Sequence, residues 1–182
     1  MVKQMIILQG GEDVRKRTNE SLIKKIGEIS ISKRILVIPW SGESDQKEKE
    51  YRTILCNYFS DNGFQETLFL EKNDMNDVID RKFDSVDVIY LPGGDTGILY
   101  KELEKHSLQH RLMKFNGLIL GNSAGAIVLT RGTWMEGIFY PGFGIVDFYI
   151  SVHYIPESDQ LAEIDSTLKI NIPENMWITV TP

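Results

Sequence analysis

The chain has 182 residues, 42% of them hydrophobic and 25% charged, which is enough apolar material for one compact domain with a sizeable core. Its net charge of −6 argues against a nucleic-acid partner, because such proteins usually gather lysine and arginine on one face. The single cysteine excludes an internal disulfide, and no Cys or His spacing resembles a zinc site. The first apolar run, residues 5–9, is too short for a signal peptide or a membrane span, so we expect a cytoplasmic protein without metal or cofactor.

Apolar runs of strand length recur along the chain, with helix-like stretches between them. They cover residues 5–9, 34–40, 66–70, 87–94 and 117–122. Several are apolar at successive positions, which is typical of strands covered on both faces in a parallel sheet. The pattern predicts an α/β protein, a three-layer α/β/α sandwich with a mostly parallel sheet.

Two of the intervening stretches have helical periodicity. Residues 47–63 carry apolar side chains at helical spacing and stop at Asn62-Gly63, a pair typical of a helix C-cap. Residues 106–117 place three apolar side chains on one stripe and put His106 and His110 four positions apart on the same predicted helix. Because no acidic ligand motif lies nearby, we interpret the two histidines as exposed helix residues and not as a metal pair.

Ser123 lies where the predicted strand GLIL runs through GNSAGA into an apolar helix start. The pattern G-x-S-x-G at such a junction is typical of a nucleophile elbow, in which a tight turn strains the serine backbone and requires small neighbours. Backbone N–H groups at the helix start, that of Ala124 first, can stabilise an oxyanion. We predict that Ser123 is a nucleophile, against the alternative of a serine that caps a helix.

A serine nucleophile needs a base and a carboxylate that orients the base. His153 follows the strand-like run FYISV, at whose end it reaches the same edge of the sheet as Ser123, so we predict it as the base. Between these two residues the chain has two acids, Glu136 and Asp147. Glu136 lies in a loop-like stretch with room to reach back and is the favoured third member; Asp147 is the alternative.

A second glycine-rich turn, LPGGDTGIL, also follows a predicted strand and precedes a helix. Gly93 and Gly94 can expose unpaired backbone N–H groups there and supply the second oxyanion donor. Asp95 either caps the following helix or contacts substrate. Arg131, eight residues after Ser123, either pairs with a substrate carboxylate or satisfies carbonyls at the end of the elbow helix.

Four stretches, taken in order, resemble the peptidase E family, the aspartyl dipeptidases and their cyanophycinase-like relatives. They are LPGGDTGIL, GNSAGA, PGFGIVDFYISVHY and IPENMWITV, and the resemblance covers nearly the whole chain. It implies a sandwich like that of class I glutamine amidotransferases, Ser123 as nucleophile, His153 as base, and oxyanion donors from Gly94 and Ala124. We expect residues 1–182 to form one such domain, and leave open whether a C-terminal segment is missing, since relatives continue with a further strand.

The expected function is therefore that of a serine peptidase acting on short peptides. The resemblance implies dipeptides with an acidic first residue and a free amino terminus. Two alternatives stay open, an α/β-hydrolase-type esterase and a catalytically silent binding domain on the same scaffold. We expect a small peptide as the only partner of a monomer or homodimer, with neither nucleic acid nor a membrane.

Overall fold

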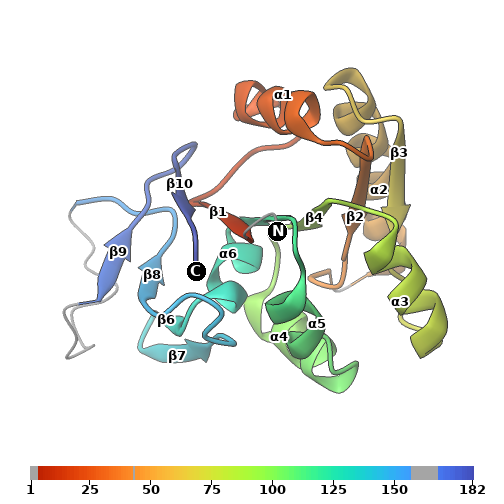
Figure 1. The fold of residues 1–182 in the computed structure, drawn as a ribbon. Helices are drawn as coiled ribbons and strands as arrows, with labels where there is room; N and C mark the ends of the chain where they lie inside the picture. Colours follow the sequence, from red (N-terminus) through yellow and green to blue (C-terminus); the bar gives the residue numbers. More distant parts are fainter. Residues whose placement is uncertain (1–3, 43, 157–167) are drawn as a thin grey trace.

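The computed structural model describes residues 4–42, 44–156 and 168–182 (Figure 1). A central sheet has the strand order β10 (Trp177–Val180), β1 (Met5–Gln9), β5 (Leu118–Asn122), β4 (Val88–Leu91), β2 (Arg34–Val37) and β3 (Glu66–Phe69). Its strands pair in parallel, except that β10 runs antiparallel to β1. The predicted parallel strands are thus confirmed, and each begins and ends within a few residues of the apolar run that predicted it.

Helices cover both faces of this sheet. They are α1 (Glu20–Ile29), α2 (Asp45–Asp61), α3 (Asn76–Asp84), α4 (Thr96–Lys105), α5 (Gln109–Lys114) and α6 (Ala124–Leu129). Side chains from α1 and α2 share one apolar cluster, and side chains from the other four helices share a second cluster. In Figure 1, α1 lies above the sheet and α4 and α5 lie below it.

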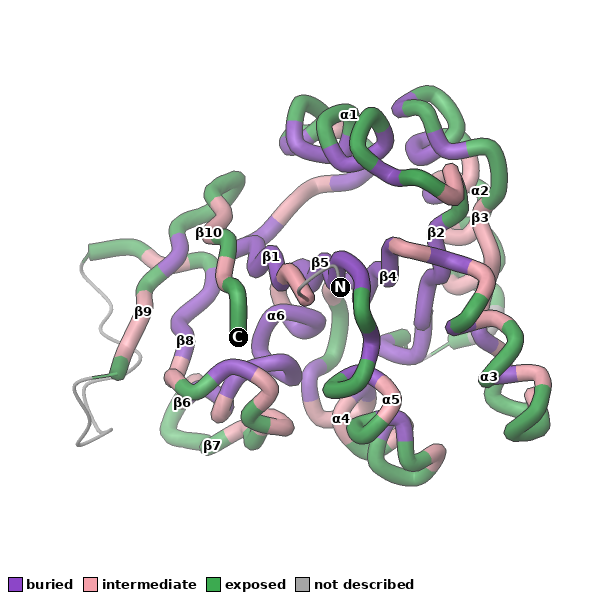
Figure 2. Tube along the Cα trace, viewed as in Figure 1, coloured by how far each residue is buried: buried purple, intermediate pink, exposed green. Residues whose placement is uncertain are grey.

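Alternate strand residues divide between these two clusters. On β1, for example, Ile6 and Leu8 belong to one cluster and Ile7 to the other. A strand points successive side chains to opposite faces, so a sheet that is covered on both sides must be apolar at every position. Figure 2 shows β1, β5, β4 and β2 buried along most of their length. The three-layer α/β/α sandwich follows from this division.

Helix α2 confirms the expected apolar stripe and its end. Leu55, Tyr58 and Phe59 are buried against the sheet. The helix ends at Asp61, Asn62 is its C-cap, and Gly63 follows with φ of +95°, a left-handed conformation that glycine adopts without a steric penalty.

The single helix expected to carry both His106 and His110 is instead two helices. His106 is the C-cap residue of α4, and α5 begins only at Gln109. Ser107 between them has φ of +53°, which no continuous helix allows. The two rings therefore do not share one helix face. His106 packs on Trp40, with ring centroids 4.8 Å apart.

Two small sheets lie beside the central one. The loop expected around Glu136 is a hairpin of β6 (Gly132–Met135) and β7 (Ile138–Pro141), and β8 (Tyr149–Ser151) pairs in parallel with β9 (Lys169–Asn171). None of the helices in the described part of the chain has the length and apolar character needed to cross a bilayer.

Candidate active site

The turn between β5 and α6 has the geometry of a nucleophile elbow. Ser123 has φ of 49° and ψ of −108°, a strained conformation for a residue other than glycine. Its N–H donates to the carbonyl of Gln9 on the neighbouring strand, over 3.1 Å. A Cβ atom on Gly125 would collide with the carbonyl of Leu91, so only glycine lets α6 pack this closely on β4. Strain at the serine and small neighbours are the two features that the motif predicted.

His153 lies beside the serine. The distance between Ser123 Oγ and His153 Nε2 is 2.7 Å, that of a hydrogen bond. His153 comes just after β8, and its backbone N–H donates to the carbonyl of Gly10 over 2.7 Å. Its φ of 50° turns the chain away from the strand direction at this point. Two residues that are 30 positions apart are thus held together at the carboxyl edge of the sheet.

The other ring nitrogen of His153 contacts a carboxylate that was not among the sequence candidates. Nδ1 forms a hydrogen bond with Glu174 Oε2, and both side chains are about half exposed. Glu174 lies in the loop between β9 and β10, and this loop is hydrogen-bonded to the end of β1 through Asn175 and Met176. A Cβ atom on Gly11 would collide with both side chains of the pair.

The expectation for Glu136 does not hold. Glu136 sits at the turn of the β6–β7 hairpin with φ of 51°, followed by Gly137 with φ of 76°. This pair of positive φ values is typical of a tight two-residue hairpin turn, which exposes the Glu136 side chain. The stretch is a hairpin and not a free loop, and the carboxylate bonded to His153 Nδ1 is that of Glu174.

Arg131 and Asp147 are engaged with each other. Arg131 Nε lies 2.6 Å from Asp147 Oδ1, and the guanidinium stands over the Tyr149 ring at 5.7 Å. Among the described residues, the Arg131 guanidinium is thus bonded to a carboxylate and not to a carbonyl at the end of α6. Asp95 caps α4, accepting a hydrogen bond from the N–H of Ile98 over 2.7 Å. Both expected substrate-binding residues thus have structural partners.

The candidate oxyanion donors are available for a ligand. Ser41 holds the glycine turn, since its Oγ donates to the carbonyl of Gly93 over 2.6 Å and its own carbonyl accepts from the N–H of Asp95 over 2.9 Å. Within the described residues, the N–H groups of Gly94 and Ala124 make no hydrogen bond. A Cβ atom on Gly93 would stand 3.4 Å from Ser123 Cβ, so the turn lies directly against the serine.

A pocket of about 670 Å³ opens in front of Ser123. Its lining includes both glycines of the turn, together with Ser41, Tyr51, Asn122 and His153. Five charged residues also line it, which are Glu12, Arg15, Lys47, Glu48 and Glu50. Asp95 and Arg131 are not among the lining residues. No group of three or more His, Cys, Asp or Glu side chains in the described residues is arranged to hold a metal ion.

Glu12 is a partly buried residue in the lining of this pocket. Burial raises the pKa of its carboxyl, although hydrogen bonds from Tyr58, Gln9 and the Asn19 backbone act in the opposite direction. Burial likewise raises the pKa of Tyr51 to about 12. The wall therefore favours neutral side chains beneath the more exposed serine and histidine.

Glu174 was missed because the search for an acid was confined to the chain between Ser123 and His153. The order Ser, His, Glu places the acid last, and only the pairing of β10 with β1 brings it back to the site. Two signals could have found it. Glu174 stands in IPENMWITV, one of the four stretches that carry the family resemblance, and Gly10-Gly11 marks a close approach of another backbone segment.

Known peptidases are similar to this chain in sequence profile and in fold. The sequence profile of peptidase family S51 matches residues 5–178. Among solved structures, a peptidase from an acI-B1 actinobacterium is similar with a TM-score of 0.76 and 20% identity, over 98% of this chain and 83% of that one. A protein from Listeria monocytogenes EGD-e described as peptidase E is similar with a TM-score of 0.69 and 18% identity, over 99% of both chains. A comparison with curated proteins finds no match. The chain therefore belongs to peptidase family S51, a family of serine peptidases.

Proposed function

We propose that this peptidase hydrolyses short peptides with Ser123 as nucleophile, His153 as base and Glu174 as the orienting carboxylate. The observation that carries the proposal is the continuous hydrogen-bonded row from Ser123 Oγ through both nitrogens of His153 to Glu174, at the mouth of a pocket. The arrangement has the roles of a Ser-His-acid triad, in which the acid sets the imidazole tautomer.

In this mechanism Ser123 Oγ attacks the peptide carbonyl carbon while His153 Nε2 takes the hydroxyl proton. The tetrahedral oxyanion is stabilised by the N–H groups of Gly94 and Ala124. In such sites each donor lowers the free energy of the transition state by about 3 kcal/mol. His153 then gives its proton to the departing amine. Water, deprotonated by the same histidine, hydrolyses the acyl-enzyme and regenerates Ser123.

We propose a dipeptide with an acidic first residue and a free amino terminus as the preferred substrate. The family resemblance suggests this class. A pocket of about 670 Å³ is within the range of sites for small molecules, which supports a short peptide over a long one. Arg131, the cation first considered for the acidic group, is paired with Asp147 and does not support the preference.

The test is a panel of dipeptides and small acyl esters, assayed for released amino acids or acids. We expect dipeptide cleavage, and a loss of at least about 10³-fold in kcat for both Ser123→Ala and His153→Ala, with unchanged circular dichroism. Cleavage of esters alone would point to an esterase. Near wild-type activity in either variant would remove that residue from the mechanism, and no turnover of any compound would favour a silent binding domain.

A further inference from the structure

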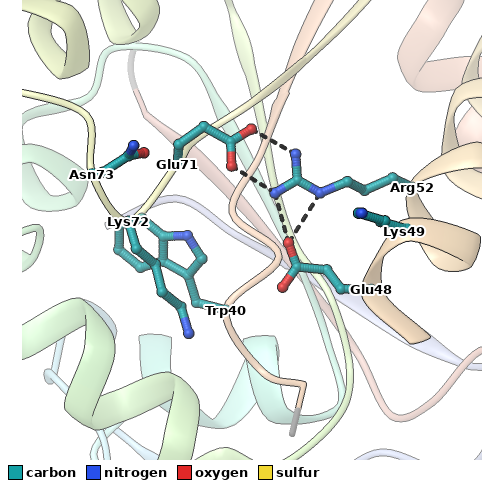
Figure 3. A pocket seen from close by; sticks show the side chains of 7 residues that line it. All are labelled: Trp40, Glu48, Lys49, Arg52, Glu71, Lys72 and Asn73. Carbon is teal, nitrogen blue, oxygen red and sulfur yellow. Dashed lines mark hydrogen bonds and ion pairs between the residues drawn. The ribbon is translucent and has the colours of Figure 1, made fainter. Parts of the chain in front are cut away.

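The charged side chains of the Ser123 pocket differ in whether they have partners. Glu48 accepts from Arg52, whose Nε and Nη2 lie 3.0 and 2.6 Å from Glu48 Oε1. Figure 3 shows this guanidinium placed between Glu48 and Glu71. Glu12 is partly buried and accepts hydrogen bonds from the Tyr58 hydroxyl, the Gln9 amide and the Asn19 backbone N–H. Two of the acids that line the pocket are thus already engaged within the protein.

The turn that follows β1 contains three consecutive basic residues, Arg15, Lys16 and Arg17, in different situations. Lys16 Nζ pairs with Asp13 Oδ2 over 2.9 Å. Arg17 pairs with one carboxylate from α1 and another from α2. Arg15 has no ion pair with any described residue; only its backbone N–H is held, by Asp13 Oδ1 over 3.1 Å. The side chain of Asp13 thus pairs with Lys16, and the Arg15 guanidinium has no ion pair with a described residue.

Arg15 is also the member of this trio that lines the Ser123 pocket. Its charge acts on the inner wall, where it opposes the rise in the pKa of Tyr51 that burial causes. Lys47, near the start of α2, lines the same pocket and likewise has no ion pair within the described part of the chain. Glu50 is the exposed acid at the rim. The pocket that contains Ser123 is thus lined by two cations that have no ion pair with a described residue.

We propose that Arg15 is a specificity-determining residue that binds a carboxylate of the peptide substrate, with Lys47 as a second and weaker cation. A guanidinium donates two parallel hydrogen bonds to a carboxylate, whereas an ammonium acts as a point charge. The inference rests on the proposed function. The carboxylate belongs to the side chain of the first residue or to the C-terminus of the dipeptide, and the chemistry at Arg15 is the same for both.

The experiment compares three substrates, Asp-Leu, Asn-Leu and Asp-Leu amide, with wild type, Arg15→Met and Arg15→Lys. Lys16→Met is the matched control, because it removes a neighbouring cation that has its own partner. If Arg15 binds the side chain, Arg15→Met lowers kcat/KM for Asp-Leu by about 10- to 100-fold, leaves Asn-Leu within about twofold, and Arg15→Lys is intermediate.

If Arg15 binds the C-terminal carboxylate, Arg15→Met lowers kcat/KM equally for Asp-Leu and Asn-Leu. Wild type then cleaves the amide less well than Asp-Leu, whereas Arg15→Met cleaves the two at similar, low rates. Equal behaviour of Arg15→Met and Lys16→Met on all three substrates overturns the proposal. If wild type cleaves none of them, the peptidase function fails separately. Calorimetric binding of Asp-Leu to wild type and Arg15→Met then decides: weaker binding by the variant supports the carboxylate site, and no difference, or no binding, overturns it.

Discussion

Two pockets lie on either side of the first turns of α2, and they differ in how their charges are paired. One, of about 670 Å³, contains Ser123 and His153; the other, of about 520 Å³, lies around Arg52 (Figure 3). Glu48 lines both. Volume therefore does not separate a candidate active site from an ordinary surface hollow in this molecule.

The chemistry of the linings does separate them. In the second pocket, Arg52 donates to both oxygens of Glu71 and to Glu48, and it also stands over the Phe69 ring at 4.7 Å. The main hydrogen-bond donor and acceptors of this pocket, the Arg52 guanidinium and the two carboxylates, are thus bonded to one another. In the first pocket, the N–H of Gly94 and the Arg15 guanidinium have no such partner within the described residues. Groups without internal partners are the ones that can bind a ligand.

The largest effect among these predictions is expected at Glu174, the acid bonded to His153. Glu174→Gln keeps the shape of the side chain but removes the charge that stabilises imidazolium and fixes the tautomer of His153. We expect kcat for dipeptide cleavage to fall on the order of 10³- to 10⁴-fold with little change in KM. Steady-state kinetics on the substrate found in the dipeptide panel measures it.

Two other carboxylates serve as controls for Glu174. Glu136→Gln changes an exposed hairpin turn, and Asp147→Asn releases Arg131 from its ion pair. Both variants should keep kcat within about threefold of wild type, since single surface changes are usually small. A larger loss of kcat in either of them than in Glu174→Gln would transfer the orienting role to that residue.

A smaller effect, on stability and not on chemistry, is expected in the second pocket. Arg52→Leu leaves Glu48 and Glu71 close together without their shared cation, so the free energy of unfolding should fall by about 1–3 kcal/mol. We expect kcat to stay within about twofold. Urea denaturation and kinetics measure the two quantities.

The exposed pair of Arg81 with Asp77 provides the comparison for Arg52. Arg81→Leu should change the unfolding free energy by less than about 0.5 kcal/mol, because both side chains are mostly exposed. A collapse of kcat in Arg52→Leu comparable to that in Glu174→Gln would mean that the two pockets act together in the reaction, against the distinction made above.

The smallest effect concerns the pH dependence of stability at Glu12. Because burial raises its pKa in the folded state, the folded protein holds this proton more tightly than the unfolded chain does. Stability contributed by the neutral carboxyl is present at low pH and is lost as pH rises from the ordinary glutamate range through the raised pKa. Glu12→Gln removes this contribution. Urea denaturation at pH 5 and pH 7.5 should show that the variant loses less stability between the two than wild type; an equal loss would contradict a raised pKa.

The βα order and the elbow could be predicted from the sequence because both are local. Successive apolar positions identify strands that are covered on both faces, and Ser123 is placed by a strand, a turn and a helix that are contiguous in the chain. His153 was also placed at this edge because a strand precedes it, but that strand, β8, belongs to a small separate sheet, and the His153 backbone is bonded to Gly10 after β1. The strands and the elbow needed no knowledge of how distant segments meet, whereas the position of His153 depends on the contact with Gly10.

The acid and the charged groups of the pocket were decided by tertiary structure. Glu174 reaches His153 because β10 pairs with β1 and the loop before it is bonded to Gly10 and Gly11. Likewise, Arg131 and Arg15 look alike in the sequence, but Arg131 pairs with Asp147, whereas Arg15 lines the pocket that contains Ser123. Which charge finds a partner depends on segments that are far apart in the chain, and a local pattern carries no information about their distance in space.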